Sequence, residues 1–164
     1  MTMLEVKLEG LALDMTTNTP VIILAPVELE KVLPIWIGHA EAWAIAMELS
    51  GVASKRPLTH DLIRQVIETM GGKVDRVEIT DLKEQTFFAV IQISRDGKTE
   101  RIDARPSDSI AVALKTGAQI YVNEDLFTVE AQDTSETPAM PTDRESLRER
   151  LRNINPEDFG KYSL

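Results

Sequence analysis

The stretch IDARPSDSIAVALKTGAQIYV, residues 102–122, decides the fold because it joins a strand, a helix and a second strand in immediate succession. Its first residues alternate in polarity, and an apolar helical run follows over roughly residues 107–116. The segment at 117–122 is typical of a short buried strand. Pro106 suits the first turn of a helix, where its missing N–H costs nothing. The stretch therefore predicts a sheet that carries a helix.

Further strands are predicted toward the N-terminus. LEVKLE at residues 4–9 alternates strictly between apolar and charged side chains, which indicates a half-buried strand. A turn at 16–20 separates it from the apolar run VIILA at 21–25, so the two segments predict a hairpin. PIWIG at 34–38 predicts another short strand.

Three more strands are predicted in the middle of the chain, at residues 74–82, 86–94 and 99–104. The last two flank Asp96–Gly97, a strong hairpin signal because a tight primed turn needs positive φ. The natural interpretation is an antiparallel meander of three strands.

Two helices are predicted between these strand regions. HAEAWAIAMELSG at 39–51 is apolar nearly all round, which indicates a buried helix, and Glu41 and Glu48 share one of its faces. A second helix starts at Thr59 and ends at Gly71–Gly72. Its apolar stripe comprises Leu62, Ile63, Val66, Ile67 and Met70. Altogether the sequence predicts an α+β fold with a mixed, largely antiparallel sheet, an N-terminal hairpin, a three-strand meander and about three main helices.

The composition changes after Gln132, where DTSETPAMPTD contains almost no large apolar residue and is typical of a linker. A capping box, Thr142 with Glu145, then predicts a short helix with a thin apolar stripe. We expect one folded domain at 1–131 and a flexible linker and tail at 132–164.

The totals restrict the class of protein. The 164 residues include no cysteine, which excludes a disulfide framework, a thiolate metal site and a thiol nucleophile. No apolar run is long enough to span a membrane, and the first residues lack a signal-peptide pattern. We therefore expect a cytoplasmic protein with no membrane partner, and a homo-oligomer is left open. The formal charge of −9 argues against a general nucleic-acid coating protein, because such proteins are basic.

Polar residues gather at three predicted helix starts. They are His39 and Glu41, then Arg56, His60 and Asp61, and then Asp103, Arg105, Ser107 and Asp108. A structural interpretation is available for each group. Ser107 or Asp108 would cap a helix, an acid there complements the helix dipole, and Arg105 would pair with a neighbouring acid.

A functional interpretation takes the three groups together. Helix N-termini favour anions, and an arginine adds a bidentate donor for phosphate. Glu41, Asp103 and Asp108 are candidate ligands for Mg²⁺ or Mn²⁺ if the fold brings them together. No zinc, P-loop or serine-hydrolase motif is present.

Four longer blocks of the chain are more specific together than any single polar group. LPIWIGHAEAWAIAMELSG, RPLTHDLI, TFFAVIQI and IDARPSDSIAVALKTGAQIYV resemble, in order, the successive blocks of the bifunctional nuclease domain family, over roughly residues 4–130. The resemblance implies a compact α/β unit, activity on DNA and RNA, and nucleic acid as the partner. The C-terminal segment that resembles the UvrB–UvrC contact motif in some members has no counterpart here.

Two functions follow as hypotheses. In the first, the chain is a nuclease-like hydrolase of phosphodiester bonds, assisted by a divalent metal bound to Glu41, Asp103 and Asp108. Proton transfer would fall to His39 or His60. Phosphate binding would fall to Arg56, Arg105 and Ser107. In the second, the chain is a non-catalytic regulatory module that binds an anionic small molecule or a protein.

Overall fold

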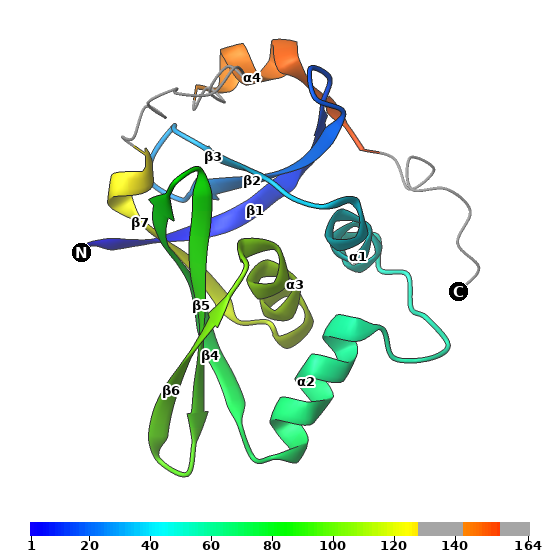
Figure 1. Cartoon of the computed structure of the whole chain (residues 1–164), viewed down its shortest axis with the longest axis vertical. Coiled ribbons are helices and arrows are strands. Elements are labelled where there is room, and N and C mark those ends of the chain that lie inside the picture. Colours follow the sequence, from blue (N-terminus) through cyan, green and yellow to red (C-terminus); the bar gives the residue numbers. More distant parts are fainter. Residues whose placement is uncertain (128–142, 155–164) are drawn as a thin grey trace.

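A computed structural model describes residues 1–127 and 143–154, and in this part of the chain a single twisted sheet of eight strands forms the framework (Figure 1). The strands are β1 (Met3–Asp14), β2 (Thr19–Pro26), β3 (Leu33–Trp36), β4 (Lys73–Lys83), β5 (Thr86–Arg95), β6 (Lys98–Ala104), β7 (Gln119–Asn123) and β8 (Leu151–Asn153). Their order is β3-β2-β1-β7-β4-β5-β6, and β8 pairs with β1. Every pairing is antiparallel except the parallel contact between β4 and β7. The predicted α+β fold, its hairpin and its meander are confirmed.

The three main helices cover the same face of the sheet (Figure 1). They are α1 (His39–Leu49), α2 (Thr59–Thr69) and α3 (Pro106–Thr116), and the described residues add the 3₁₀ turn η1 (Glu124–Phe127) and the short α4 (Arg144–Arg150). Helix α3 packs against β4 and β5 and contacts both α1 and α2. It therefore lies at the centre of the helical layer. No helix in these residues is long and apolar enough to cross a membrane.

Local chemistry explains where α3 begins and ends. Arg105 has an extended backbone, with φ −74° and ψ 148°, and Pro106 then occupies the first helical turn. The helix ends at Gly117, whose left-handed φ of 73° is readily adopted by glycine. The predicted β5–β6 turn is also confirmed, because Asp96 and Gly97 both have positive φ, at 50° and 74°.

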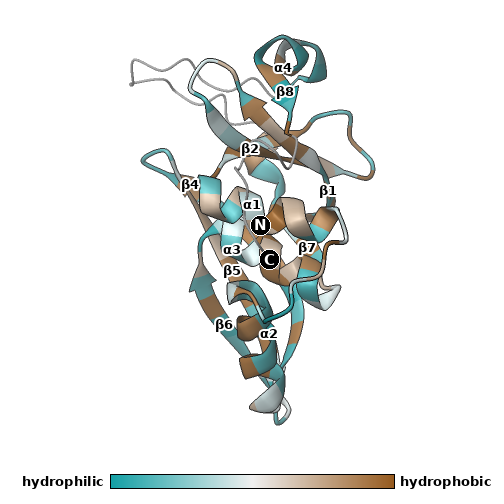
Figure 2. Cartoon of the chain, turned by 90° about the vertical axis from the view of Figure 1, so that its right-hand side faces the viewer, coloured by the Kyte–Doolittle hydropathy of each residue, from teal (hydrophilic) through white to brown (hydrophobic). Residues whose placement is uncertain are grey.

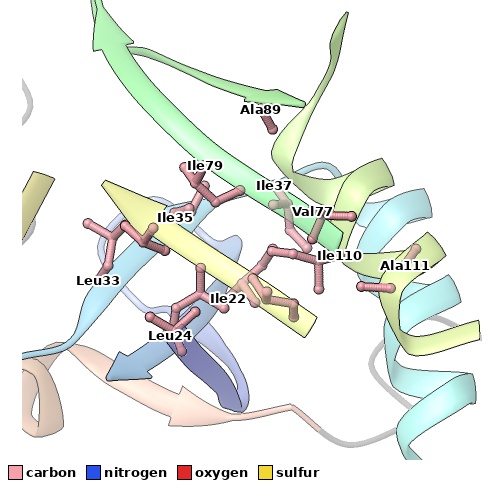
Figure 3. Packing of buried hydrophobic residues seen from close by; sticks show 14 of the residues in the cluster. Ile22, Leu24, Leu33, Ile35, Ile37, Val77, Ile79, Ala89, Ile110 and Ala111 are labelled. Carbon is pink, nitrogen blue, oxygen red and sulfur yellow. The ribbon is translucent and has the colours of Figure 1, made fainter. Parts of the chain in front are cut away.

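The core lies between the sheet and the helices and draws on segments far apart in the sequence (Figure 3). Ile22 and Ile35 come from the N-terminal strands, Val77 and Ile79 from β4, and Ile110 from α3. Each of these side chains is 2% exposed or less. Burial of such side chains is the main favourable term in folding.

The apolar stripe predicted for α2 divides into two faces. Ile63 and Ile67 pack against the core. Leu62, Val66 and Met70 are 54%, 53% and 58% exposed. Figure 2 shows hydrophobic segments, coloured brown, along α2. Because α2 lies at the margin of the helical layer, only part of this wide stripe reaches the sheet.

The C-terminal segment differs from the expected loose tail. Residues 143–154 dock on the sheet, because β8 pairs with the second half of β1 and Leu147 on α4 is only 5% exposed. The helix cap is Asp143, whose Oδ1 accepts a hydrogen bond from the Ser146 N–H at 2.8 Å, in place of the predicted Thr142. The predicted linker at 132–142 lies outside the described residues, so a domain boundary at 131 stays a prediction.

Docking of this segment rests on a buried ion pair. Asp14 at the end of β1 is 0% exposed, and both of its carboxylate oxygens accept hydrogen bonds from Arg150, at 3.0 and 3.1 Å. The indole N–H of Trp36 and the backbone N–H of Thr16 also donate to this carboxylate, each at 2.9 Å. The thin apolar stripe predicted for this helix did not indicate that the segment binds to β1, because Arg150 is not part of that stripe.

Candidate functional site

Four polar side chains from the starts of three helices meet at one place, and we call them the helix-start cluster. They are Glu41 of α1, His60 of α2, Arg105 at the N-cap of α3, and Asp108 in the first turn of α3. Arg105 donates from Nε to Asp108 Oδ2 and from Nη2 to Glu41 Oε1, both at 2.9 Å. The Nε2 atom of His60 lies 3.0 Å from the other oxygen of Asp108. The four residues therefore form one continuous hydrogen-bonded chain.

The sequence next to each helix start explains this convergence. Gly38 precedes α1, and a Cβ atom at this position would collide with the carboxylate of Glu41. Glycine therefore leaves room for Glu41 to fold back toward the start of its own helix. On α2, the Asp61 carboxylate accepts the backbone N–H of Leu58 at 3.0 Å, which fixes the turn that presents His60.

The electrostatics of the cluster favour ionised side chains. Partial burial alone would raise the pKa of Asp108, but hydrogen bonds from His60 and Arg105 outweigh it and lower this pKa. The pKa of Arg105 is raised, chiefly by Asp108 and secondarily by Glu41. The positive ends of the helix dipoles add to the stabilisation of both carboxylates. The cluster thus contains two acidic side chains bridged by one guanidinium.

Exposure distinguishes the outer and inner members of the cluster. The side chain of Arg105 is 65% exposed, whereas those of Glu41 and His60 are 18% and 8% exposed. A guanidinium has five N–H donors. Among the contacts of residues 1–127 and 143–154, Arg105 uses only its Nε and Nη2 atoms. The remaining nitrogen is free to donate to an anion from solvent.

The other predicted site residues lie apart from these contacts. Ser107 is 6% exposed in the first turn of α3. His39 opens α1 with an exposed side chain, and it makes no hydrogen bond or ion pair within the described part of the chain. Arg56 lies on the loop between α1 and α2, where it lines a cleft.

Asp103 is on the opposite face of the sheet, which corrects its predicted place in the site. Its neighbours Ile102 and Ala104 pair with Ile91 and Ala89 of β5, which belong to the core beneath the helices. Successive side chains of a strand point to opposite faces. The side chain of Asp103 therefore points away from the helical layer, and the sequence could not show this before the register was known.

The predicted metal ligands do not fit one ion together. Asp103 is separated by the sheet from Glu41 and Asp108, and the latter two already share Arg105 as their counter-ion. No group of three histidine, aspartate or glutamate side chains in the described residues is arranged to hold a metal. The geometry therefore does not support the predicted site with three carboxylate ligands.

A second charged cluster escaped prediction. Lys115 near the end of α3 bonds to Glu48 at 2.6 Å and to Asp61 at 2.9 Å. Arg64 donates to the backbone carbonyl of Lys115 at 3.3 Å. The sequence did contain one indication of this cluster, because Glu41 and Glu48 share a face of α1. Glu41 bonds to Arg105 at the start of α3, and Glu48 bonds to Lys115 near its end.

A cleft of about 480 Å³ adjoins this second cluster. It is bounded by the end of α1, the loop at 51–58, the first half of α2 and Lys115. Arg56 and Asp61 line it, but Glu41, Arg105 and Asp108 do not. Residues from the three predicted helix starts therefore meet by hydrogen bonds in the helix-start cluster. The cleft lies beside this cluster.

Comparison with known proteins places the chain in a family. Residues 22–135 match the family described as bifunctional nuclease domain. A protein of Mycobacterium tuberculosis, named only as uncharacterized, is 42% identical over 162 residues, which cover 94% of this chain and 97% of that protein.

Plant proteins are more distantly similar. Bifunctional nuclease 1 of Arabidopsis thaliana is 26% identical and bifunctional nuclease 2 of the same plant is 28% identical, each over 95 residues. These matches cover 56% of this chain and 29% of each plant protein, so the chain spans less than a third of their length. The family match covers more than half of the chain, and it confirms the resemblance found in the sequence blocks. The chain therefore belongs to the bifunctional nuclease domain family.

Proposed function

We propose that the chain hydrolyses phosphodiester bonds of DNA, RNA or both at the helix-start cluster. The observation that carries the proposal is the position of Arg105, which is mostly exposed yet fixed by carboxylates on α1 and α3. Such a guanidinium is already oriented before a phosphate arrives, so little conformational entropy is lost on binding. Membership of a nuclease family supports nucleic acid as the source of that phosphate.

Each member of the cluster has a proposed role. Arg105 binds a phosphate oxygen and offsets the charge that develops during hydrolysis. Glu41 and Asp108 hold its guanidinium in place. His60 transfers a proton, and its hydrogen bond with Asp108 orients the imidazole, as carboxylates do for catalytic histidines. A requirement for Mg²⁺ or Mn²⁺, a cytoplasmic location and a homo-oligomer stay predictions of the sequence.

A direct assay tests the proposal. Purified full-length chain is incubated with end-labelled single- and double-stranded DNA and RNA, in Mg²⁺, Mn²⁺ or EDTA. We expect fragments from the wild-type chain and none from Asp108→Asn purified in parallel, which controls for a contaminating nuclease. No cleavage under any condition, or equal cleavage by the variant, would favour the non-catalytic alternative.

The role of Arg105 leads to a prediction on binding. Arg105→Met should change the free energy of unfolding by less than about 1 kcal/mol, because the guanidinium itself is 65% exposed to solvent. It should weaken binding of an oligonucleotide in EDTA and lower the slope of log affinity against log salt by about one. Fluorescence anisotropy at several salt concentrations measures both quantities.

The matched control is Arg95→Met, which removes an exposed arginine of β5 that lies outside the cluster. We expect its affinity and salt slope to equal those of the wild type. If Arg105→Met instead unfolds the protein or binds as well as Arg95→Met, then Arg105 is part of the scaffold and not a phosphate ligand.

A further inference from the structure

The cleft beside the helix-start cluster has the dimensions of a ligand site. Its volume of about 480 Å³ falls within the range of small-molecule pockets, which is roughly 300–1,000 Å³. Its walls come from the end of α1, the loop at 51–58 and α2, and Lys115 of α3 closes one side. Residues on three helices therefore shape one concavity that the proposed hydrolysis does not use.

Cationic side chains dominate this cleft, although the whole chain is acidic. Four cations and two acids line it, whereas the chain has a formal charge of −9. The acids are Glu48 and Asp61, and both bond to Lys115. Lys55, Arg56 and Arg64 form no ion pair within the described residues, so the cleft retains an excess of positive charge.

Arg64 belongs to the cationic lining of the cleft. Its Nε atom is buried and has no hydrogen-bond partner among the described residues, although its Nη1 atom donates to the carbonyl of Lys115. The Nε atom has almost no solvent-accessible area and does not itself face the cleft, so Arg64 contributes to the lining as a cation.

Apolar side chains complete the lining. Met47, Val52, Pro57 and Leu58 contribute to the walls, and Val52 is 46% exposed. A ligand that fits this combination has a compact anionic group together with an apolar, planar or ring-like part. Arginine prefers phosphate among anions because its donors match two phosphate oxygens at once.

We propose that this cleft binds a phosphomonoester attached to a nucleoside, either as a free mononucleotide or as the phosphorylated end of a strand. A phosphomonoester carries a charge of about −1.5 to −2 at pH 7, which matches the excess of cations in the lining. The nucleoside part contacts the apolar wall. This site is distinct from the helix-start cluster and does not depend on hydrolysis there.

The two sites share the first turn of α2. His60 faces Asp108 in the cluster, while the next residue, Asp61, bonds to Lys115 at the cleft. The two sites are therefore neighbours on one helix turn, but the cleft lining contains no member of the helix-start cluster.

Calorimetric titration of the full chain in EDTA tests the proposal without any hydrolysis. The probes are adenosine 5′-monophosphate, adenosine and inorganic phosphate. We expect the nucleotide to bind saturably, phosphate more weakly and adenosine not at all. Absence of saturable nucleotide binding up to millimolar concentrations, or equal binding of adenosine, would overturn the proposal.

Variants assign the binding to the cleft. The double substitution Lys55→Ser with Arg56→Ser, on an exposed loop, should weaken nucleotide binding at least tenfold. Its matched control, Arg95→Ser with Lys98→Ser, removes the same charge at the β5–β6 turn and should leave affinity unchanged. Equal loss in both variants would show nonspecific electrostatic attraction and refute a specific site.

Two further arms separate the ligand sources and the two sites. A dinucleotide with a 5′-phosphate is compared with its 5′-hydroxyl form and with the free nucleotide, and tighter binding of the phosphorylated dinucleotide identifies a strand end as the source.

The Arg105→Met variant should bind the nucleotide with the affinity of the wild type. A tenfold loss in this variant would contradict a site separate from the cluster, whereas absent cleavage with intact nucleotide binding would refute only the proposed hydrolysis.

Discussion

Arg150→Ala should lower the free energy of unfolding by about 3–5 kcal/mol, the range for removing one partner of a buried ion pair. Its partner Asp14 is 0% exposed, and without the guanidinium its charge would remain buried, with the N–H groups of Trp36 and Thr16 and the side chain of Thr17 as donors. The guanidinium also lies over the ring of Trp36, 5.6 Å from the centroid, so the substitution removes a second contact. Urea denaturation followed by circular dichroism measures the effect.

Arg148→Ala provides the control on the same helix. Arg148 is exposed, and its replacement should change stability by less than about 0.5 kcal/mol. If Arg150→Ala destabilises the protein no more than Arg148→Ala does, the ion pair between Asp14 and Arg150 contributes little to stability.

The same ion pair should shape unfolding in acid. Burial raises the pKa of Asp14, but hydrogen bonds from Arg150, Trp36 and Thr16 prevail and lower it from 3.8 to about 2. Because the pKa is lower in the folded state, the stabilisation is complete above pH 5 and is lost as the pH falls from about 5 to about 2. The difference corresponds to about 2 kcal/mol. In Arg150→Ala this acid-dependent loss should be smaller, and an unchanged pH profile would contradict the assignment.

His60→Gln should reduce phosphodiester hydrolysis by about 10²–10⁴-fold, the usual contribution of a group that transfers a proton. Glutamine retains a polar side chain of similar size that can still donate to Asp108, but it cannot take up and release a proton. Single-turnover rates on a labelled oligonucleotide measure the effect.

His39 provides an internal control for His60, because these are the two histidines of the chain. His39 is exposed at the start of α1 and forms no hydrogen bond or ion pair with a member of the helix-start cluster within the described residues. His39→Gln should therefore reduce hydrolysis far less than His60→Gln. If His39→Gln causes the larger loss, proton transfer belongs to the start of α1 and the assignment to His60 is wrong.

The parts of the fold that depend on neighbouring residues could be predicted from the sequence. Asp96–Gly97 specified a turn because glycine and aspartate adopt the required backbone angles, and the structure has that turn. The β4–β5 turn has positive φ at Glu84 and Gln85, at 48° and 62°. Neither residue type signals such a turn, so its chemistry could not be predicted.

Features that join distant residues could be predicted only in part. Three helix starts were expected to share a site, and Glu41, His60 and Asp108 do meet around Arg105. The face of Asp103 depended on strand register, since a shift of one residue reverses every side chain. Lys115 was missed for a related reason, because its two acidic partners lie on other helices.

The placement of β1 has a consequence for the order in which the chain folds. This first strand pairs with β2 nearby, but its other edge pairs with residues 120–123 and 151–153. During synthesis, the ribosome therefore releases the N-terminal hairpin long before the strands that cover its open edge exist. Closing such long loops makes folding slow, and an uncovered strand edge is open to wrong pairing in the meantime. Completion of the sheet has to wait for the last strand to leave the ribosome.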